Sequence, residues 1–387
     1  TTDGRFDVPS TGTFYNALLE SGLSSTGFIV AAPDYYGMGR HKGFHPYVHA
    51  ETEALAGINI IEPAYQLAEM LNREKRDEIF ISGYSQGGHA AMAMQKFIQE
   101  KLIGIEITAS APMSGPYLLS RNMKQLILSE NDYLFPGYIA YMLEGYQTVY
   151  GDLYDDFNEM YKEPYATVIK EEFSDENYSI SNLHDTLNLL LTDLEGAPKP
   201  KLMFQDSIIT GLMNNPDYRI NKVLQLNDVY FWVPDSPMRM IYCEGDEQVI
   251  YTNATYTDSL MNFLGAKDVA TISAGSQYGH QQCAPHATLL ASEFFKSFLT
   301  TSVSDLAQNN VKINVYPNPA NDYITIDMDT RENKELLAEL IDINGSVLMR
   351  TLVGNRSTGL DISSLPGGVY ILTFPEYPLL SQRLVKQ

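Results

Sequence analysis

Residues 79–88 read Ile-Phe-Ile-Ser-Gly-Tyr-Ser-Gln-Gly-Gly, and this stretch carries the strongest structural signal in the chain. A short apolar run leads into Gly83-x-Ser85-x-Gly87, and a helix-prone run over 89–100 follows at once. The order predicts a strand, a sharp turn and a helix, with Ser85 at the apex. Such a turn strains the serine backbone so that the hydroxyl projects above a sheet, and only small residues fit two positions before and after it. We therefore predict that Ser85 is a nucleophile.

Apolar runs alternate with helical patterns through residues 1–300. The expected strands are Gly27–Pro33, Glu78–Gly83, Ile105–Ala111, Met238–Cys243 and Val269–Ser273. The expected helices are Thr13–Gly22, His49–Arg73, Gln86–Glu100, Thr252–Leu264 and Pro285–Leu299. Buried strands connected by helices form parallel sheets that are covered on both faces, so we predict an α/β fold with such a sheet.

The interval between Ala111 and Met238 breaks this alternation, because it carries helical patterns and scattered prolines but no clear strand. We predict a large helical cap here, inserted over the strand ends at residues 116–236. Most of its aromatic side chains are expected to pack in the core of the cap, and some to line an apolar substrate cleft. These side chains are Tyr133, Phe135, Tyr138, Tyr141, Tyr146, Tyr150, Tyr154, Phe157, Tyr161 and Tyr165.

The character of the sequence changes near residue 300. Residues 301–311 are polar and non-periodic, which is typical of a linker. Short alternating segments separated by turn signals follow, and they predict a small β-sandwich domain over residues 312–387. The expected strands are Lys312–Tyr316, Tyr323–Asp327, Leu337–Asp342, Val347–Thr351, Gly359–Asp361, Gly368–Thr373 and Leu380–Val385.

A serine hydroxyl becomes a good nucleophile only when an imidazole takes its proton, and a carboxylate must orient that imidazole. On a parallel sheet the acid is expected on a loop after a later strand. The strand that ends at Cys243 is followed by Glu244-Gly245-Asp246-Glu247. We predict Asp246 as the acid, because it lies just past the glycine where the chain leaves the sheet. Glu244 and Glu247 are its rivals.

The general base is expected after the next strand. Residues 274–280 form a Gly- and Ser-rich loop that ends in His280, before a helix expected to start near Pro285. Such a loop suits a mobile base, so we predict His280 in this role. His286 is the rival, but it falls within the start of the helix.

An oxyanion hole needs two amide donors. One is expected to be the backbone amide of Gln86, next after the nucleophile. The other normally comes from the loop after the third strand, which belongs before or at the start of this chain, so Thr1 or Thr2 is a candidate. The opening residues Thr-Thr-Asp-Gly are typical of the middle of a loop. They do not have the pattern of a signal peptide. We expect a targeting segment and early strands to precede it.

The chain has two cysteines, Cys243 and Cys283. They lie three residues before the predicted acid and three after the predicted base, so they are either within bridging distance or buried free thiols. The spacing of His41, His45 and His49 would suit a metal site on a helix. Proline and glycines in that stretch argue against a helix, so we interpret it as a loop near the mouth of the site, without a metal.

The composition excludes some classes of partner. The 387 residues carry a net charge of −22, which repels phosphate backbones, so nucleic acid is not an expected partner. No apolar run reaches about 18 residues, so no transmembrane segment is predicted.

The segment Gly83-Tyr84-Ser85-Gln86-Gly87-Gly88 resembles the nucleophile segment of secretory-lipase-like α/β-hydrolases. Residues 32–39, Gly245-Asp246, and His280 with Cys283 and Pro285 are also similar to that family. The resemblance covers nearly all of residues 1–300 except the cap. It implies ester hydrolysis, with Ser85, Asp246 and His280 as the triad. The family's His-Gly turn before a Thr pair is absent here.

Residues from about 312 resemble the C-terminal sorting domain of type IX secretion substrates. The matching stretches are Val315–Ala320, Ile341–Gly345, Leu365–Tyr370 and Gln382–Lys386. The resemblance implies handling by the type IX machinery and export across an outer membrane, to a secreted or cell-surface location. A generic carbohydrate-binding or spacer sandwich is the alternative.

We predict a serine hydrolase that cleaves small-molecule or lipid carboxylic esters through an acyl-enzyme, without a cofactor. The first alternative is a serine peptidase of the prolyl-oligopeptidase kind, which shares the Gly-x-Ser-x-Gly-Gly run. It would need a carboxylate or arginine in the cap to hold a peptide terminus, whereas the cap is more aromatic than charged. The second alternative is a non-catalytic surface binding protein on a hydrolase scaffold.

Overall fold

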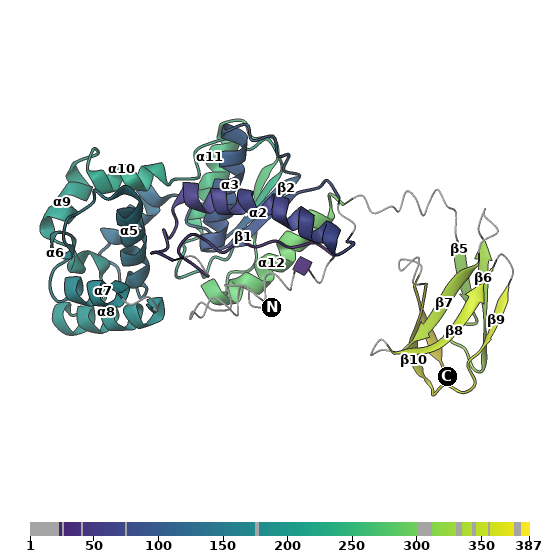
Figure 1. Ribbon diagram of the computed structural model, residues 1–387. Helices are drawn as coiled ribbons and strands as arrows, with labels where there is room; N and C mark the ends of the chain where they lie inside the picture. The colour runs from purple at the N-terminus through teal and green to yellow at the C-terminus, as the bar shows by residue number, and fades with distance from the viewer. Residues whose placement is uncertain are drawn as a thin grey trace. The chain divides into compact units, whose positions relative to one another are not determined.

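The chain divides into two compact units, Thr1–Leu299 and Thr300–Gln387, in the computed structural model (Figure 1). The structure describes residues 23–24, 27–39, 42–73, 76–174, 178–299, 312–329, 335–342, 346–354, 357–374 and 381–387. The helix expected at Thr13–Gly22 and the linker expected at 301–311 lie outside these ranges. The boundaries at residues 300 and 312 therefore stay predictions.

In the described part of the first unit, four parallel strands form one sheet in the order β1-β2-β3-β4. The strands are β1 (Phe80–Tyr84), β2 (Ala109–Met113), β3 (Met238–Tyr242) and β4 (Val269–Ser273). Because the spatial order equals the chain order and all pairs are parallel, the carboxyl ends of the strands share one edge. The predicted parallel α/β sheet is confirmed.

One expected strand is not part of this sheet. Residues 28–35 have irregular backbone in the structure, so the prediction of a strand at Gly27–Pro33 was wrong. The apolar side chains of the segment are used for packing instead: the Phe28 ring lies edge-on to Phe80 and Phe295, with centroids 5.6 and 6.2 Å away. An apolar run indicates burial, but it does not reveal whether the main chain pairs with a neighbouring strand.

Helices cover both faces of the sheet (Figure 1). On one face, α2 (Ala50–Met70), α3 (Gln86–Glu100) and α11 (Thr252–Phe263) pack in a core that includes Ile81 and Met240. On the other face, α12 (His280–Lys296) packs against alternate residues of β2 and β3. Helix α12 begins at His280 and not near Pro285, where the sequence predicts its start. Proline is common at the first position of a helix, but here Pro285 lies inside the helix.

The described part of the segment between β2 and β3 contains helices joined by irregular stretches, with no strand longer than an isolated bridge, and forms a body of its own beside the sheet (Figure 1, teal). Tyr146, Tyr161 and Tyr165 are at most 1% exposed and lie in its core, so burial is the main role of these aromatics. Its helices are η2 (Leu119–Met123), α4 (Lys124–Ile127), α5 (Pro136–Tyr150), α6 (Phe157–Met160), α7 (Tyr165–Ser174), α8 (Ile180–Glu195), η3 (Pro200–Met203), α9 (Asp206–Asn214) and α10 (Arg219–Leu226).

The second unit is a small all-β domain, as predicted. Its described strands form two antiparallel sheets, in the orders β11-β10-β7-β8 and β5-β6-β9, around a common apolar core. Alternate side chains of β7 point inward, as expected for a half-buried strand. The strands are β5 (Lys312–Tyr316), β6 (Tyr323–Asp329), β7 (Leu336–Ile341), β8 (Val347–Val353), β9 (Thr358–Asp361), β10 (Gly368–Thr373) and β11 (Gln382–Lys386).

Candidate active site

Ser85 lies at the sharp turn between β1 and α3. Its backbone has φ 58° and ψ −119°, a conformation that non-glycine residues rarely adopt, and its amide donates to the carbonyl of Met113 at 2.9 Å. A Cβ atom at Gly83 would stand 2.1 Å from the carbonyl oxygen of Gly87, and one at Gly88 would stand 2.4 Å from that of Met113. The strained turn is thus held by close backbone contacts on both sides.

Gly87 differs from the expectation for this turn. A Cβ atom there would meet nothing within 4 Å, so steric crowding does not require a glycine at this position. The backbone of Gly87 is what a side chain at Gly83 would clash with. On the helix side of the turn, the position without room for a side chain is Gly88, which lies against the Met113 carbonyl. The pattern therefore predicted the crowding at Gly83 correctly and assigned the crowding on the helix side to the wrong glycine.

The two glycines of the pattern should respond differently to alanine. We expect Gly83→Ala to lower the free energy of unfolding by about 3 kcal/mol, because backbone would have to move away from the new methyl group. Gly87→Ala is the matched control and should change stability by less than about 1 kcal/mol. Denaturant titration followed by the fluorescence of Trp232, the single tryptophan of the chain, measures both. Equal losses in the two variants would contradict this account of the turn.

Three side chains from separate segments meet at the carboxyl edge of the sheet. The Ser85 hydroxyl lies 2.8 Å from His280 Nε2, and His280 Nδ1 lies 2.7 Å from Asp246 Oδ2. The other carboxylate oxygen of Asp246 accepts hydrogen bonds from the backbone amides of Gln248 and Val249, at 3.0 and 2.8 Å. Asp246 and His280 are each 6% exposed. The arrangement can pass a proton from the hydroxyl to the imidazole while the carboxylate holds the ring.

The rival residues have other partners. Glu244 accepts from the Ser273 hydroxyl at 2.8 Å, and Glu247 accepts from the backbone amide of His280 at 3.0 Å. His286 stacks on the ring of Tyr278, with centroids 4.1 Å apart. In the described part of the chain, the Ser85 hydroxyl is hydrogen-bonded to His280 and to none of these three residues.

The base is held from several sides. The hydroxyl of Tyr84 donates to the carbonyl of His280 at 2.5 Å, and burial raises the pKa of Tyr84, so this donor keeps its proton. Cys243 and Cys283 form a disulfide with Cα atoms 6.0 Å apart, which settles the question that their spacing left open. The bridge joins the end of β3, where the Asp246 loop begins, to the first turn of α12, where His280 lies.

Removing this bridge should mainly cost stability. The disulfide closes a loop of 40 residues, so Cys243→Ala with Cys283→Ala should lower the free energy of unfolding by about 4 kcal/mol. Denaturant titration followed by Trp232 fluorescence measures the loss. Adding a reductant should destabilise the unmutated chain and leave the double variant unchanged. A loss below about 1 kcal/mol would show that the loop is constrained by other contacts.

The oxyanion donors are only partly visible. Gln86 is the first residue of α3, and the amides of a first helical turn have no partner in a preceding turn. Its backbone amide therefore suits the predicted donor beside Ser85. The predicted second donor, Thr1 or Thr2, lies outside the described residues.

The histidines near residue 45 do not form a surface loop. His45 and His49 are 1% and 4% exposed, and they bind the Tyr36 carbonyl and the Tyr150 hydroxyl respectively. Its described residues are irregular up to α2, as expected; Lys42 and Gly43 are exposed, whereas His45 and His49 are buried, and His45 contacts Gln86 beside the nucleophile turn. His41 lies outside the described residues. Within the described ranges, no group of three His, Cys, Asp or Glu side chains is arranged to hold a metal ion.

Sequence reasoning missed a buried polar group beside the site. Glu53 and His89 are 1% and 0% exposed and bind each other at 2.6 Å next to Gln86. Their only sequence signal is that each is a charged or titratable residue within an otherwise apolar helix face. Such residues usually lie on the surface, so the pattern did not single them out.

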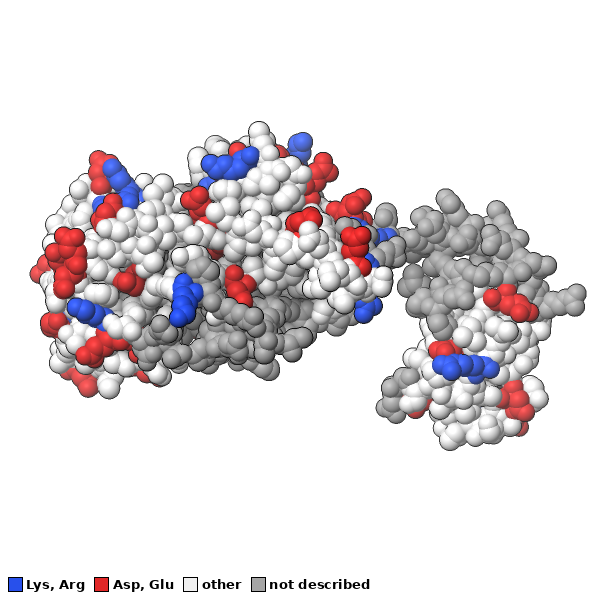
Figure 2. All heavy atoms as spheres, viewed as in Figure 1, with Lys and Arg blue, Asp and Glu red and all other residues white. Residues whose placement is uncertain are grey.

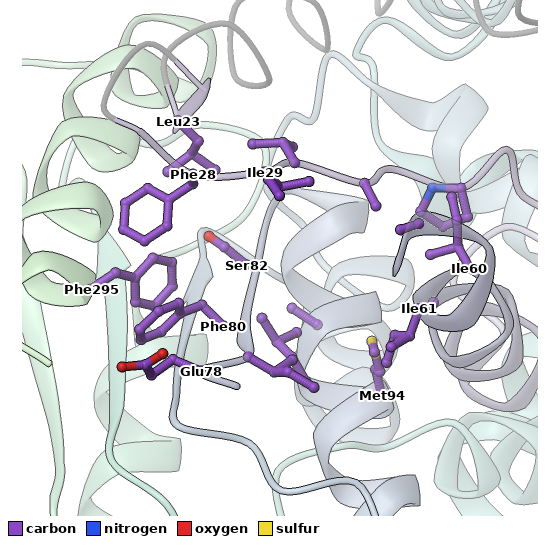
Figure 3. A pocket seen from close by; sticks show the side chains of 18 of the residues that line it. Leu23, Phe28, Ile29, Ile60, Ile61, Glu78, Phe80, Ser82, Met94 and Phe295 are labelled. Atoms are coloured by element: carbon purple, nitrogen blue, oxygen red, sulfur yellow. The ribbon is translucent and has the colours of Figure 1, made fainter. Parts of the chain in front are cut away.

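A cavity of about 500 Å³ lies against the edge strand β1 and is lined mainly by apolar side chains, among them Phe28, Phe80 and Met94 (Figure 3). Its lining does not include Ser85, Asp246 or His280, so we do not assign it as the substrate site. On the face shown in Figure 2, acidic side chains are spread over the surface with basic ones interspersed. No described helix combines the length and hydrophobicity needed to span a membrane.

Comparison with solved structures finds two informative relatives. The chain is similar to a candidate hydrolase from Legionella pneumophila, with 26% identity and a TM-score of 0.63 over 72% of this chain and 71% of that one. It is also similar to the rice cell wall degrading esterase LipA from Xanthomonas oryzae, with 26% identity and a TM-score of 0.56 over 70% and 69% of the two chains. No curated protein matches it in sequence.

Residues 314–386 match the family described as the secretion system C-terminal sorting domain, so the sorting prediction is confirmed over the generic sandwich. A domain of this family indicates secretion or attachment at the outer surface. The first unit combines a parallel sheet covered by helices with hydrolase and esterase relatives. The first unit therefore has the fold of an α/β-hydrolase and is similar in structure to lipase- and esterase-type hydrolases, and the chain carries a secretion system C-terminal sorting domain.

Proposed function

We propose that this chain is a serine hydrolase that cleaves carboxylic esters. The observation that carries the proposal is the continuous hydrogen-bonded line from the Ser85 hydroxyl through His280 to Asp246, with spacings of 2.8 and 2.7 Å. Ser85 Oγ attacks the ester carbonyl while His280 Nε2 takes its proton. The Gln86 amide binds the oxygen that becomes negative in the tetrahedral intermediate.

The tetrahedral intermediate then breaks down, and the remaining steps of the reaction also use His280 for proton transfer. His280 returns its proton to the leaving alcohol, and an acyl group remains on Ser85. Water attacks the acyl-enzyme with His280 again as the base, and release of the acid restores the free hydroxyl. Asp246 keeps the ring in the Nδ1–H tautomer throughout and stabilises its positive form.

The choice of esters over peptides is supported by two features. One structural relative is a cell wall degrading esterase. The predicted cap is rich in aromatic rings: Tyr47, just before α2, stacks on Tyr138 and Tyr141 of α5 with centroids 5.7 and 4.8 Å apart. Aromatic walls suit apolar or aryl groups better than a charged peptide terminus.

The domain limits belong to the same proposal. We propose a hydrolase domain over residues 1–300 with its cap at 116–236, a linker at 301–311 and the sorting domain at 312–387. The sorting domain would bring the chain to the type IX secretion machinery, and the small-molecule or lipid ester would be met after export.

The test is a substrate panel on the full chain. Nitrophenyl esters from acetate to decanoate should be hydrolysed and aminopeptidase substrates should not, and a fluorophosphonate probe should label the chain once. Cleavage of peptide substrates alone would favour the peptidase. A folded sample that neither labels nor hydrolyses any ester would indicate a binding protein on a hydrolase scaffold.

A further inference from the structure

A buried carboxylate lies directly behind the nucleophile turn. Glu53 of α2 accepts a hydrogen bond from the side-chain amide of Gln86 at 2.8 Å and one from His89 Nδ1 at 2.6 Å. Its two oxygens therefore hold two residues of the first turn of α3, immediately after Ser85. The side chains of Glu53 and His89 are both fully buried, so water does not compete for these contacts.

The Gln86 side chain is held at a second point. Its amide nitrogen lies 2.6 Å from His45 Nε2, while His45 Nδ1 lies 2.8 Å from the Tyr36 carbonyl and must donate to it. Burial lowers the pKa of His45, so the ring is neutral and Nε2 can accept. The amide thus uses both of its hydrogens, one on Glu53 and one on His45, which leaves the side chain a single orientation.

His89 links this group to the cap. Its Nε2 lies 2.9 Å from the backbone carbonyl of Asn227, and its Nδ1 faces the Glu53 carboxylate, so both ring nitrogens meet oxygen atoms. The Asn227 side chain in turn accepts from the amide of Ala50 at 2.9 Å and donates to the hydroxyl of Tyr150 on α5 at 3.1 Å.

We propose that Glu53 is a positioning residue that holds the Gln86 backbone amide at the oxyanion. A buried charged pair seldom stabilises a fold more than apolar residues of similar size would, so a role in geometry explains this pair better than stability alone. Displacement of the first turn of α3 by a fraction of an ångström would move the amide relative to Ser85. This inference rests on the proposed ester hydrolysis and adds a residue to it.

The first test compares two Glu→Leu changes on the full chain. In Glu53→Leu neither Gln86 nor His89 has a polar partner at position 53, so kcat for a nitrophenyl ester should fall on the order of 10–100-fold while KM changes less than about twofold. Fluorophosphonate labelling, which also develops an oxyanion, should slow by the same factor. Glu144→Leu is the control, because Glu144 is a half-buried carboxylate of the cap bonded to Tyr154, remote in sequence from the turn. It should leave both rates unchanged.

A second variant covers the case in which Glu53→Leu does not fold. Gln86→Ala keeps the backbone amide but removes the side chain that Glu53 holds, so it should lower kcat and the labelling rate by a similar factor. In the double variant the two losses should not multiply, because both break the same link.

Specific results would overturn the inference. It fails if folded Glu53→Leu or Gln86→Ala keeps wild-type kcat, or if kcat falls while the labelling rate does not. It also fails if the two losses multiply in the double variant. Failure of the proposed function is different, since then the unmutated chain itself would neither label nor hydrolyse esters.

Discussion

Ser85→Ala is expected to lower kcat/KM for a nitrophenyl ester by about 10⁴-fold or more and to abolish fluorophosphonate labelling. The variant removes the only atom that can form the acyl-enzyme in the proposed mechanism, while the imidazole 2.8 Å away stays in place. Stability should hold or rise slightly, because alanine at a strained turn loses no buried partner except His280. The measurement is steady-state hydrolysis beside gel detection of the label and Trp232 fluorescence for folding.

A serine elsewhere in the same unit serves as the control for this variant. Ser259 is exposed on α11, and its hydroxyl donates to the carbonyl of Thr255 one turn earlier. Ser259→Ala should retain full activity and full labelling. Residual labelling in folded Ser85→Ala, at a rate near that of the unmutated chain, would place the nucleophile at another residue and end the proposed mechanism.

Asp246→Asn is expected to lower kcat/KM by about 10³–10⁴-fold with little effect on KM. The amide would present an NH₂ group or a weaker acceptor to His280 Nδ1, so the ring would turn or take the tautomer in which Nε2 carries the proton. In that tautomer Nε2 cannot accept the proton of Ser85. Steady-state hydrolysis of a nitrophenyl ester over a range of concentrations, by Asp246→Asn and by the unmutated chain, gives kcat and KM for each.

Glu244→Gln tests the rival acid at the same loop. Glu244 bonds the Ser273 hydroxyl and is exposed, so this variant should keep activity within about twofold of the unmutated chain. A loss in Glu244→Gln as large as that in Asp246→Asn would mean that the loop as a whole, and not one carboxylate, supports the base.

Much of the fold could be predicted because its determinants are local. Helix α3 has the predicted bounds, Gln86–Glu100, since a tight turn and a run of helix formers mark both its start and its length. The strands β5 and β10 also have the predicted bounds, because turn residues separate them and their apolar residues alternate. The start of α12 was predicted wrongly because proline is common at helix starts, whereas Pro285 lies inside this helix.

The site was predictable only up to its candidate residues. Strand ends on a parallel sheet share an edge, so Ser85, Asp246 and His280 could be named from their places after strands. Their roles stay predictions, although the structure brings them within hydrogen-bond distance. The second oxyanion donor stays a prediction without a described position.

Local patterns along the chain were enough for the turn at Ser85, the α/β alternation and the β-domain, since each depends on residues a few positions apart. Folding alone decided that Cys243 pairs with Cys283, that Asp246 and not its neighbours binds the ring of His280, and that Glu53 is buried against Gln86 and His89. The physical reason is that the free energy of a buried polar group depends on its partner. That partner comes from a distant segment, and no spacing in the sequence records it.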